Sequence, residues 1–127
     1  MAIVKKWIVN GMRLSLEKHD ELPGKLWYTG YVERYVGGMG LDYSAEQHLN
    51  DTCKGRKPKF LEQLGVSAGQ ISYVDIDGFS MEVGFDTAHA RYIPALQDEE
   101  FLIGQVELLA QKLDKLFAEG KVSLEVI

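Results

Sequence analysis

The sequence predicts an α+β domain in which an antiparallel sheet of about three to five strands carries helices mainly on one face. Two observations lead to this class. The turn dipeptides Asn10-Gly11 and Asp77-Gly78 each lie between segments of alternating apolar residues, and a long amphipathic stripe occupies the last third of the chain. At 127 residues the chain has a common size for one domain, so we expect residues 1–127 to form a single globular domain.

The segment from Ile3 to Leu16 fits two periodicities. With a period of two it forms two strands around Asn10-Gly11, which suits a type I′ hairpin because both central residues need positive φ. With a period of 3.6 it forms one face of a helix, and the sheet then shrinks to three strands. The hairpin is favoured, because Gly11 weakens a helix interior by roughly 1 kcal/mol relative to alanine and β-branched residues crowd the start of the segment.

The next segment has apolar residues at helical spacing and is predicted to be a helix. Pro23 suits its first turn with Asp20 as the cap, and the glycine cluster at residues 37–40 ends it. The residues at helical spacing are Leu22, Leu26, Trp27, Tyr31, Arg34 and Tyr35.

Two shorter helices are expected in the middle of the chain. A capping box at Ser44 starts the first, which runs to about Cys53. Pro58 occupies a first-turn position of the second, which ends at Gly65. The buried stripe of the second helix consists of Phe60, Leu61 and Leu64.

The clearest local prediction is a hairpin within residues 70–85. A two-residue Asp77-Gly78 loop pairs Ile76 with Phe79 and sets the register of both strands. The opposite face of this hairpin carries polar side chains, as expected of a sheet with one side toward water. The predicted apolar face consists of Val74, Ile76, Phe79, Met81 and Val83.

A long helix is predicted from residue 97 to just before Gly120. Three acidic residues, 98–100, suit the positive end of its dipole, and glycine suits its C-terminal end. Beyond it, residues 121–127 alternate apolar and other side chains and predict a final strand. The helix stripe consists of Leu102, Val106, Leu109, Leu113, Leu116 and Phe117.

The net charge of −5 is divided unevenly along the chain. Residues 1–64 hold ten Lys and Arg against eight Asp and Glu, a net of +2, while residues 65–127 hold four against eleven, a net of −7. This balance disfavours general attraction to nucleic acid or to an anionic membrane. The exception is a basic cluster of four cations at residues 54–59.

Composition also limits the cellular compartment and the class of protein that we expect. No wholly apolar run exceeds four residues, far short of the roughly 20 that cross a bilayer, so we expect neither a membrane span nor a secretory signal. The single cysteine forms no internal disulfide, which favours a reducing compartment such as the cytoplasm.

No catalytic motif is present in the sequence. It lacks a phosphate-binding loop, a dinucleotide fingerprint, a nucleophile elbow and a His-Glu-x-x-His zinc motif. Cys53 and His48 lie five residues apart on a predicted helix, which turns them about 140° away from each other and prevents local pairing as thiol and base. We therefore expect no catalytic residue, no metal and no cofactor, and the chain favours a non-enzymatic protein.

The function predicted from these features is protein–protein interaction, of the inhibitor, immunity or adaptor type. Five of the thirteen aromatic residues fall within seventeen positions of one segment, next in sequence to the basic cluster. Tyrosine and tryptophan suit a wet interface, and an arginine binds carboxylates in two-pronged fashion. The predicted binding surface consists of Trp27, Tyr28, Tyr31, Tyr35, Arg56 and Lys57.

Two alternatives stay open. A small enzyme or ligand-binding protein would have a pocket between sheet and helices, with His19, His48 or His89 beside a carboxylate. A subunit of a larger assembly, such as a phage structural protein, would form a homo-oligomer by pairing an edge strand between copies. The segment 79–92 is loosely similar to a strand and loop of some phage head–tail proteins, but it covers a small fraction of the chain and transfers no residue roles.

Overall fold

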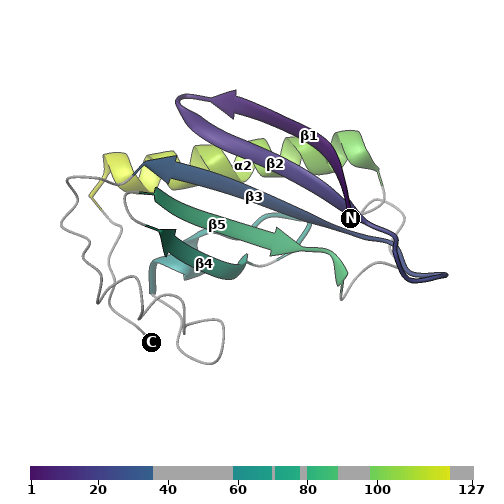
Figure 1. The fold of residues 1–127 in the computed structure, drawn as a ribbon. Coiled ribbons are helices and arrows are strands. Elements are labelled where there is room, and N and C mark those ends of the chain that lie inside the picture. Colours follow the sequence, from purple (N-terminus) through teal and green to yellow (C-terminus); the bar gives the residue numbers. More distant parts are fainter. Residues whose placement is uncertain (36–58, 70, 78–79, 89–97, 121–127) are drawn as a thin grey trace.

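The fold is a five-stranded antiparallel sheet with a long helix on one face (Figure 1). The computed structural model describes residues 1–35, 59–69, 71–77, 80–88 and 98–120. The strand order across the sheet is β1-β2-β3-β5-β4, which confirms the predicted α+β class. The elements are β1 (Ala2–Val9), β2 (Met12–His19), β3 (Trp27–Tyr35), the 3-10 helix η2 (Lys59–Gln63), β4 (Ile71–Asp77), β5 (Ser80–Asp86) and the helix α2 (Glu99–Ala118).

The first hairpin forms as predicted, with strands β1 and β2. Asn10 and Gly11 connect them with φ values of 50° and 77°, the left-handed conformation that a type I′ turn requires. β1 is one of the two outer strands of the described sheet, and its pairing with β2 shifts register between Ile3 and Lys5. Lys5 and Lys6, next to this irregularity, are both exposed.

The prediction of a helix that begins near Pro23 is wrong, because the segment Trp27–Tyr35 forms the strand β3. Trp27, Tyr31 and Tyr35 are four residues apart, a spacing that places them on one side of a helix but equally on one side of a strand. Burial follows period two through most of the strand. The turn before it closes through a hydrogen bond of 3.0 Å from the Lys25 amide to the Leu22 carbonyl.

The second hairpin forms with a register that differs from the predicted one by two residues. Val74 pairs with Val83, whereas the sequence predicted Met81 as its partner. A shift of two preserves the faces of both strands, so these three apolar side chains are buried on the same side as expected. The predicted partner of Ile76, Phe79, lies outside the described residues.

The long helix α2 confirms the predicted C-terminal helix. Its N-cap, Asp98, accepts hydrogen bonds from the amides of Glu100 and Phe101, and Gly120, with φ 67°, follows its C-cap Glu119. No helix in the described part of the chain is long and apolar enough to cross a membrane. The buried residues of α2 are Leu102, Val106, Leu109, Ala110, Leu113 and Leu116.

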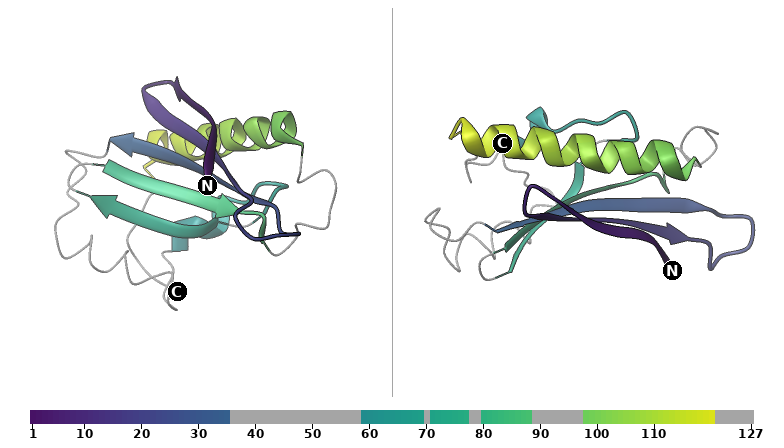
Figure 2. Two further views of the ribbon diagram at one scale, coloured as in Figure 1. Left: turned by 45° about the vertical axis from the view of Figure 1, so that its right-hand side comes forward. Right: turned by 90° about the horizontal axis from the view of Figure 1, so that it is seen from above.

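The core lies between α2 and one face of the sheet, and Figure 2 shows these two layers from above. Gly30 in β3 permits their close approach. A Cβ atom at this position would lie 2.7 Å from Phe85 of β5 and 2.7 Å from Val106 of α2. The segment predicted as a helix from Pro58 forms the 3-10 helix η2 instead, and it still buries Phe60, Leu61 and Leu64 as expected.

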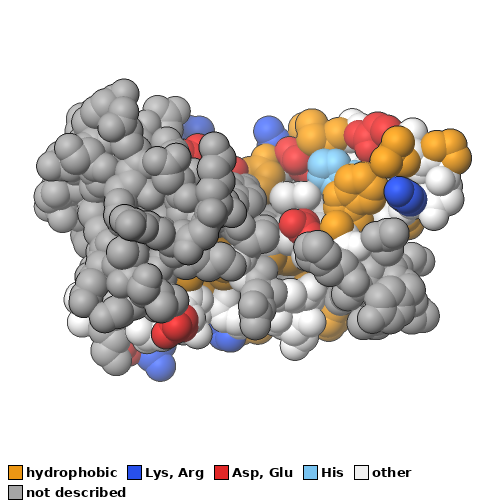
Figure 3. All heavy atoms as spheres, turned by 90° about the horizontal axis from the view of Figure 1, so that it is seen from below, with side chains coloured by type: hydrophobic (Ala, Val, Ile, Leu, Met, Phe, Trp, Pro, Cys, Tyr) orange, Lys and Arg blue, Asp and Glu red, His pale blue; other side chains and the backbone are white. Residues whose placement is uncertain are grey.

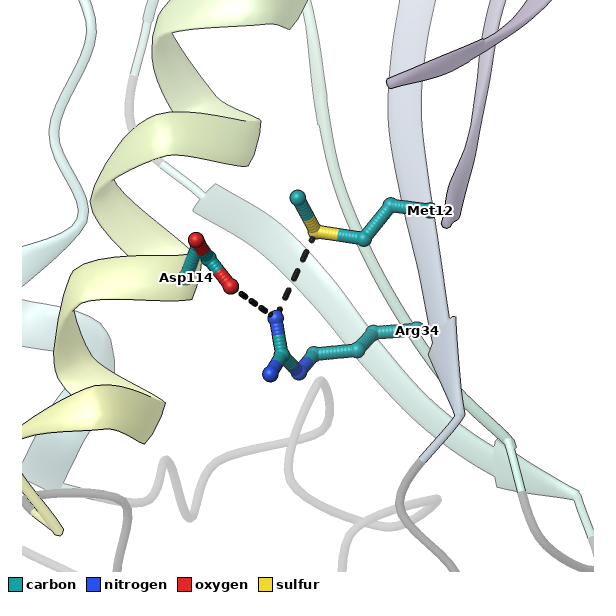
Figure 4. A network of polar contacts seen from close by, with 3 residues as sticks. All are labelled: Met12, Arg34 and Asp114. Carbon is teal, nitrogen blue, oxygen red and sulfur yellow. Dashed lines mark hydrogen bonds and ion pairs between the residues drawn. The ribbon is translucent and has the colours of Figure 1, made fainter. Parts of the chain in front are cut away.

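Polar contacts hold α2 to the sheet along its length. The Tyr28 hydroxyl donates a hydrogen bond of 2.9 Å to Glu99 at the start of the helix. Further along, the Trp7 indole donates one of 3.0 Å to Glu107. Near the end of the helix, Arg34 pairs with Asp114 (Figure 4). These contacts connect β1 and β3 with three successive regions of α2.

Three other predictions lie outside the described residues. They are the helix from Ser44 to Cys53, the glycine cluster at residues 37–40 and the final strand at residues 121–127.

Candidate functional site

The face of the sheet that points away from α2 carries the candidate site, and we call it the open face. Along each strand, its side chains alternate with the buried ones. Of the described elements only α2 and η2 are helical, and α2 packs on the opposite face of the sheet (Figure 2). Among the described side chains, those on the open face are Ile3, Lys6, Ile8, Arg13, Ser15, Glu17, His19, Trp27, Thr29, Tyr31, Glu33, Tyr35, Asp75, Ser80, Glu82 and Asp86.

The described residues of the predicted binding surface lie on both faces of the sheet. Trp27, Tyr31 and Tyr35 share the open face, because they occupy alternate positions of β3. Tyr28 points the other way into the core and is 2 % exposed, so its ring is unsuited to contact a partner. Arg56 and Lys57 lie outside the described residues.

Apolar side chains on the open face are unusually exposed. Tyr35 is 68 % exposed, Ile8 is 70 % exposed and Ile3 is 54 % exposed. The two isoleucines were missed as site residues, because strict alternation along the first strand places Ile3 and Ile8 on opposite sides. The register shift between Ile3 and Lys5 brings them onto one face. Large apolar side chains in contact with water are typical of a surface that binds another molecule.

His19 and Trp27 form a stacked pair at one end of the open face. Their ring centroids lie 5.2 Å apart and their planes differ by 8°. The His19 Nε2 atom is 2.9 Å from the Thr29 hydroxyl, whereas the predicted pocket required a carboxylate partner. Figure 3 shows hydrophobic side chains with acidic ones among them on the surface seen from below. His48 and His89 lie outside the described residues.

The open face is acidic on balance. Its described charged residues comprise five carboxylates, while Lys6 and Arg13 are its two cations. One cross-strand row runs from Arg13 through Glu33 and Glu82 to Asp75, on four neighbouring strands. Arg13 pairs with Glu33 across 3.5 Å, and the Arg13 side chain is 78 % exposed. The other two carboxylates of this face are Glu17 and Asp86.

A hollow of about 400 Å³ opens on the same face, over β1, β2, β3 and β5. This volume lies within the range of small-molecule sites. The polar residues that line it are Lys6, Arg13, Ser15, Tyr31, Glu33 and Glu82.

The wall of the hollow includes a tyrosine held in place by hydrogen bonding. The Tyr31 hydroxyl donates a hydrogen bond of 2.9 Å to Glu17. Burial raises the pKa of Tyr31, and its hydrogen bond to Glu17 adds to the rise, while the neighbouring Ser15 hydroxyl acts in the opposite direction. The phenol is therefore neutral at physiological pH and keeps acceptor capacity on its oxygen.

Ser15 is the most unusual residue of the hollow. It is 3 % exposed, and its hydroxyl has no hydrogen-bond partner among the described residues. This hydroxyl is close enough to the Tyr31 phenol to act to lower its pKa. The two groups nevertheless do not meet the geometry of a hydrogen bond. Buried hydroxyls are paired in most proteins, so an unpaired one beside a hollow points to a missing partner.

Among the described residues, no group of three or more His, Cys, Asp or Glu side chains is arranged to hold a metal ion. The arrangement of the open face instead suits non-covalent binding, with exposed apolar side chains, acidic groups and one hollow. Comparison of the chain with protein-family models, curated proteins and solved structures found no match.

Proposed function

We propose that this protein is a non-enzymatic binding domain that docks a positively charged surface of another protein on its open face. The observation that carries the proposal is the exposure of Tyr35, Ile8 and Ile3 on a face where five carboxylates accompany two cations. Apolar anchors supply binding energy, and the surrounding charge selects the partner.

The position of the anchors supports this proposal. Trp27, Tyr31 and Tyr35 project from one strand in the middle of the sheet, so ordering them on binding costs little conformational entropy. Tyrosine and tryptophan are enriched at interface centres, and their ring faces attract Lys and Arg side chains.

The charge of the open face supports a basic partner. Glu33, Glu82 and Asp75 lie side by side on three neighbouring strands, and their negative potential attracts cations at the first encounter. The same potential repels phosphate backbones, which makes a nucleic acid a poor partner for this face.

The test is affinity capture with the protein as bait in an extract of its native host, followed by titration of the purified captured protein. Tyr35→Ala removes an anchor and Asp75→Lys reverses a charge; each is expected to weaken binding by about fivefold or more. Binding should also weaken as salt rises from about 0.05 to 0.5 M, because the charges are screened.

Glu62→Lys is the matched control, since Glu62 is an exposed carboxylate on η2 and is not part of the open face. This variant is expected to retain the partner with unchanged affinity. A captured protein that binds all three variants equally, or one with an acidic surface, would overturn the proposal.

A cytoplasmic location belongs to the same proposal and is supported by the single cysteine of the chain. The part of the predicted binding surface formed by Arg56 and Lys57 stays a prediction.

A further inference from the structure

The hollow on the open face differs in character from the exposed anchors around it. The anchors are exposed apolar side chains. One of them, Ile8, also lines the hollow together with Trp7 and Leu14, but the other six lining residues supply two cations, two carboxylates and two hydroxyl groups. The net charge of the hollow is zero, so the acidic balance of the whole face does not explain it.

The charges of the hollow are separated by sign across the sheet. Lys6 and Arg13 lie on β1 and β2, while Glu33 and Glu82 lie on β3 and β5. Arg13 and Glu33 face each other across 3.5 Å where the two sides meet. Neighbouring strands are about 4.8 Å apart, so a molecule crossing the hollow passes from a positive side to a negative side within about 10 to 15 Å. A ligand with one negative and one positive end complements this order.

The Ser15 hydroxyl lies between the two sides. β2 sits between the outer cationic strand and β3, and Ser15 is directly opposite both Lys6 and Tyr31 in the two ladders. A buried hydroxyl without a partner destabilises the folded state, and alanine at the same position would avoid that cost. A ligand that hydrogen-bonds this hydroxyl accounts for a serine here.

We propose that the hollow binds a small zwitterion, a molecule of amino-acid or dipeptide size with one carboxylate and one ammonium group. The carboxylate contacts Lys6 and Arg13 and accepts a hydrogen bond from Ser15, and the ammonium contacts Glu33 and Glu82. A volume of about 400 Å³ accommodates a ligand of this size. The hollow lies within the open face and shares Ile8, Tyr31, Glu33 and Glu82 with the docking surface, but zwitterion binding does not depend on the docking function.

The experiment is calorimetric titration of the wild-type protein with 4-aminobutyrate, 6-aminohexanoate and glycylglycine. Hexanoate and hexylamine serve as singly charged analogues matched in length to 6-aminohexanoate. At least one zwitterion is expected to bind ten times more tightly than either analogue. Amide chemical shifts should change at Lys6, Ser15 and Tyr31, which face one another on three strands.

Two substitutions test the roles of individual residues. Ser15→Ala is expected to weaken zwitterion binding by about fivefold while raising the melting temperature, because it removes the unpaired hydroxyl. Glu33→Gln is expected to weaken the binding of the zwitterions and to leave hexanoate binding unchanged, since the substitution alters only the side of the hollow that contacts the ammonium group. Glu62→Gln, away from the hollow, is the control and should bind like the wild type.

Three results would overturn the proposal: no zwitterion binds, the zwitterions bind no more tightly than hexanoate and hexylamine, or Ser15→Ala binds them as well as the wild type does. Tyr35→Ala separates this proposal from the docking function. It removes a docking anchor outside the hollow, so it should weaken the binding of the protein partner and leave zwitterion binding unchanged.

Discussion

Arg34 on β3 holds its Nη1 atom 2.5 Å from the Oδ1 atom of Asp114 on α2. The same guanidinium contacts the Met12 sulfur at 3.8 Å (Figure 4). It also lies 4.4 Å from the centroid of the Phe117 ring. A strand in the middle of the sheet is thereby joined to the C-terminal half of the helix through charge, hydrogen bonding and ring contact together.

Replacing Arg34 with alanine is expected to lower the free energy of unfolding by about 1 to 2 kcal/mol, because the charged hydrogen bond and the ring contact are both lost. Urea unfolding followed by circular dichroism measures the change. Arg13→Ala is the matched control: its ion pair with Glu33 is long and its side chain exposed, so it should cost less than about 0.5 kcal/mol. Equal losses in the two variants would contradict the assigned role of Arg34.

Two glycine-to-alanine substitutions should change stability in opposite directions. Gly30→Ala places a Cβ atom 2.7 Å from Phe85 and Val106 and is expected to destabilise the fold by about 1 to 3 kcal/mol. Gly104→Ala, on the exposed side of α2, meets no atom within 4 Å and should stabilise the helix by about 0.5 to 1 kcal/mol. Thermal unfolding of both variants measures the difference. A stable Gly30→Ala variant would show that the close contact of sheet and helix is not required.

Tyr28 makes stability depend on pH in the alkaline range. Burial and the hydrogen bond to Glu99 raise its pKa from 10.0 to about 12 in the folded protein. Between these values the folded state keeps a proton that the unfolded state has lost, so the contribution of Tyr28 is full below pH 10 and falls as pH rises toward 12. The stability difference between wild type and Tyr28→Phe should therefore shrink over this range, as measured by urea midpoints at pH 8, 10 and 11.5.

Tyr35→Phe is the control for this measurement, since Tyr35 is an exposed tyrosine on the same strand. Its stability difference from the wild type is expected to stay nearly constant. A difference for Tyr28→Phe that does not change above pH 10 would show that the phenol ionises with equal ease in the folded and unfolded chains.

Elements with local signals could be predicted from the sequence. The hairpin around Asn10 and Gly11 and the helix that begins after Asp98 were predicted correctly, because turn conformation and capping depend on neighbouring residues. β3 was predicted as a helix because a spacing of four residues satisfies both periods, and its partners lie far away in sequence. The available signs of a strand were the β-forming residues Thr29, Tyr31 and Val32, together with Gly30, which weakens a helix interior.

The candidate site was predictable only in part. Trp27, Tyr31 and Tyr35 were recognised as a group, and the structure keeps them on one face although the element is different. The hollow could not be predicted, because it brings Ser15 together with residues of four strands as distant in sequence as Lys6 and Glu82. That juxtaposition depends on the strand order β1-β2-β3-β5-β4, which no local pattern encodes.

The irregular outer strand β1 has a consequence for behaviour at high concentration. A free strand edge is a template for fibril growth, in which identical strands add in continuous register. The register shift between Ile3 and Lys5 interrupts that template, and two adjacent exposed lysines put like charges against those of an incoming copy. We therefore expect the protein to resist amyloid-like stacking although it exposes Ile3 and Ile8 on this strand, and we expect exchange of both lysines for threonine to remove much of that protection.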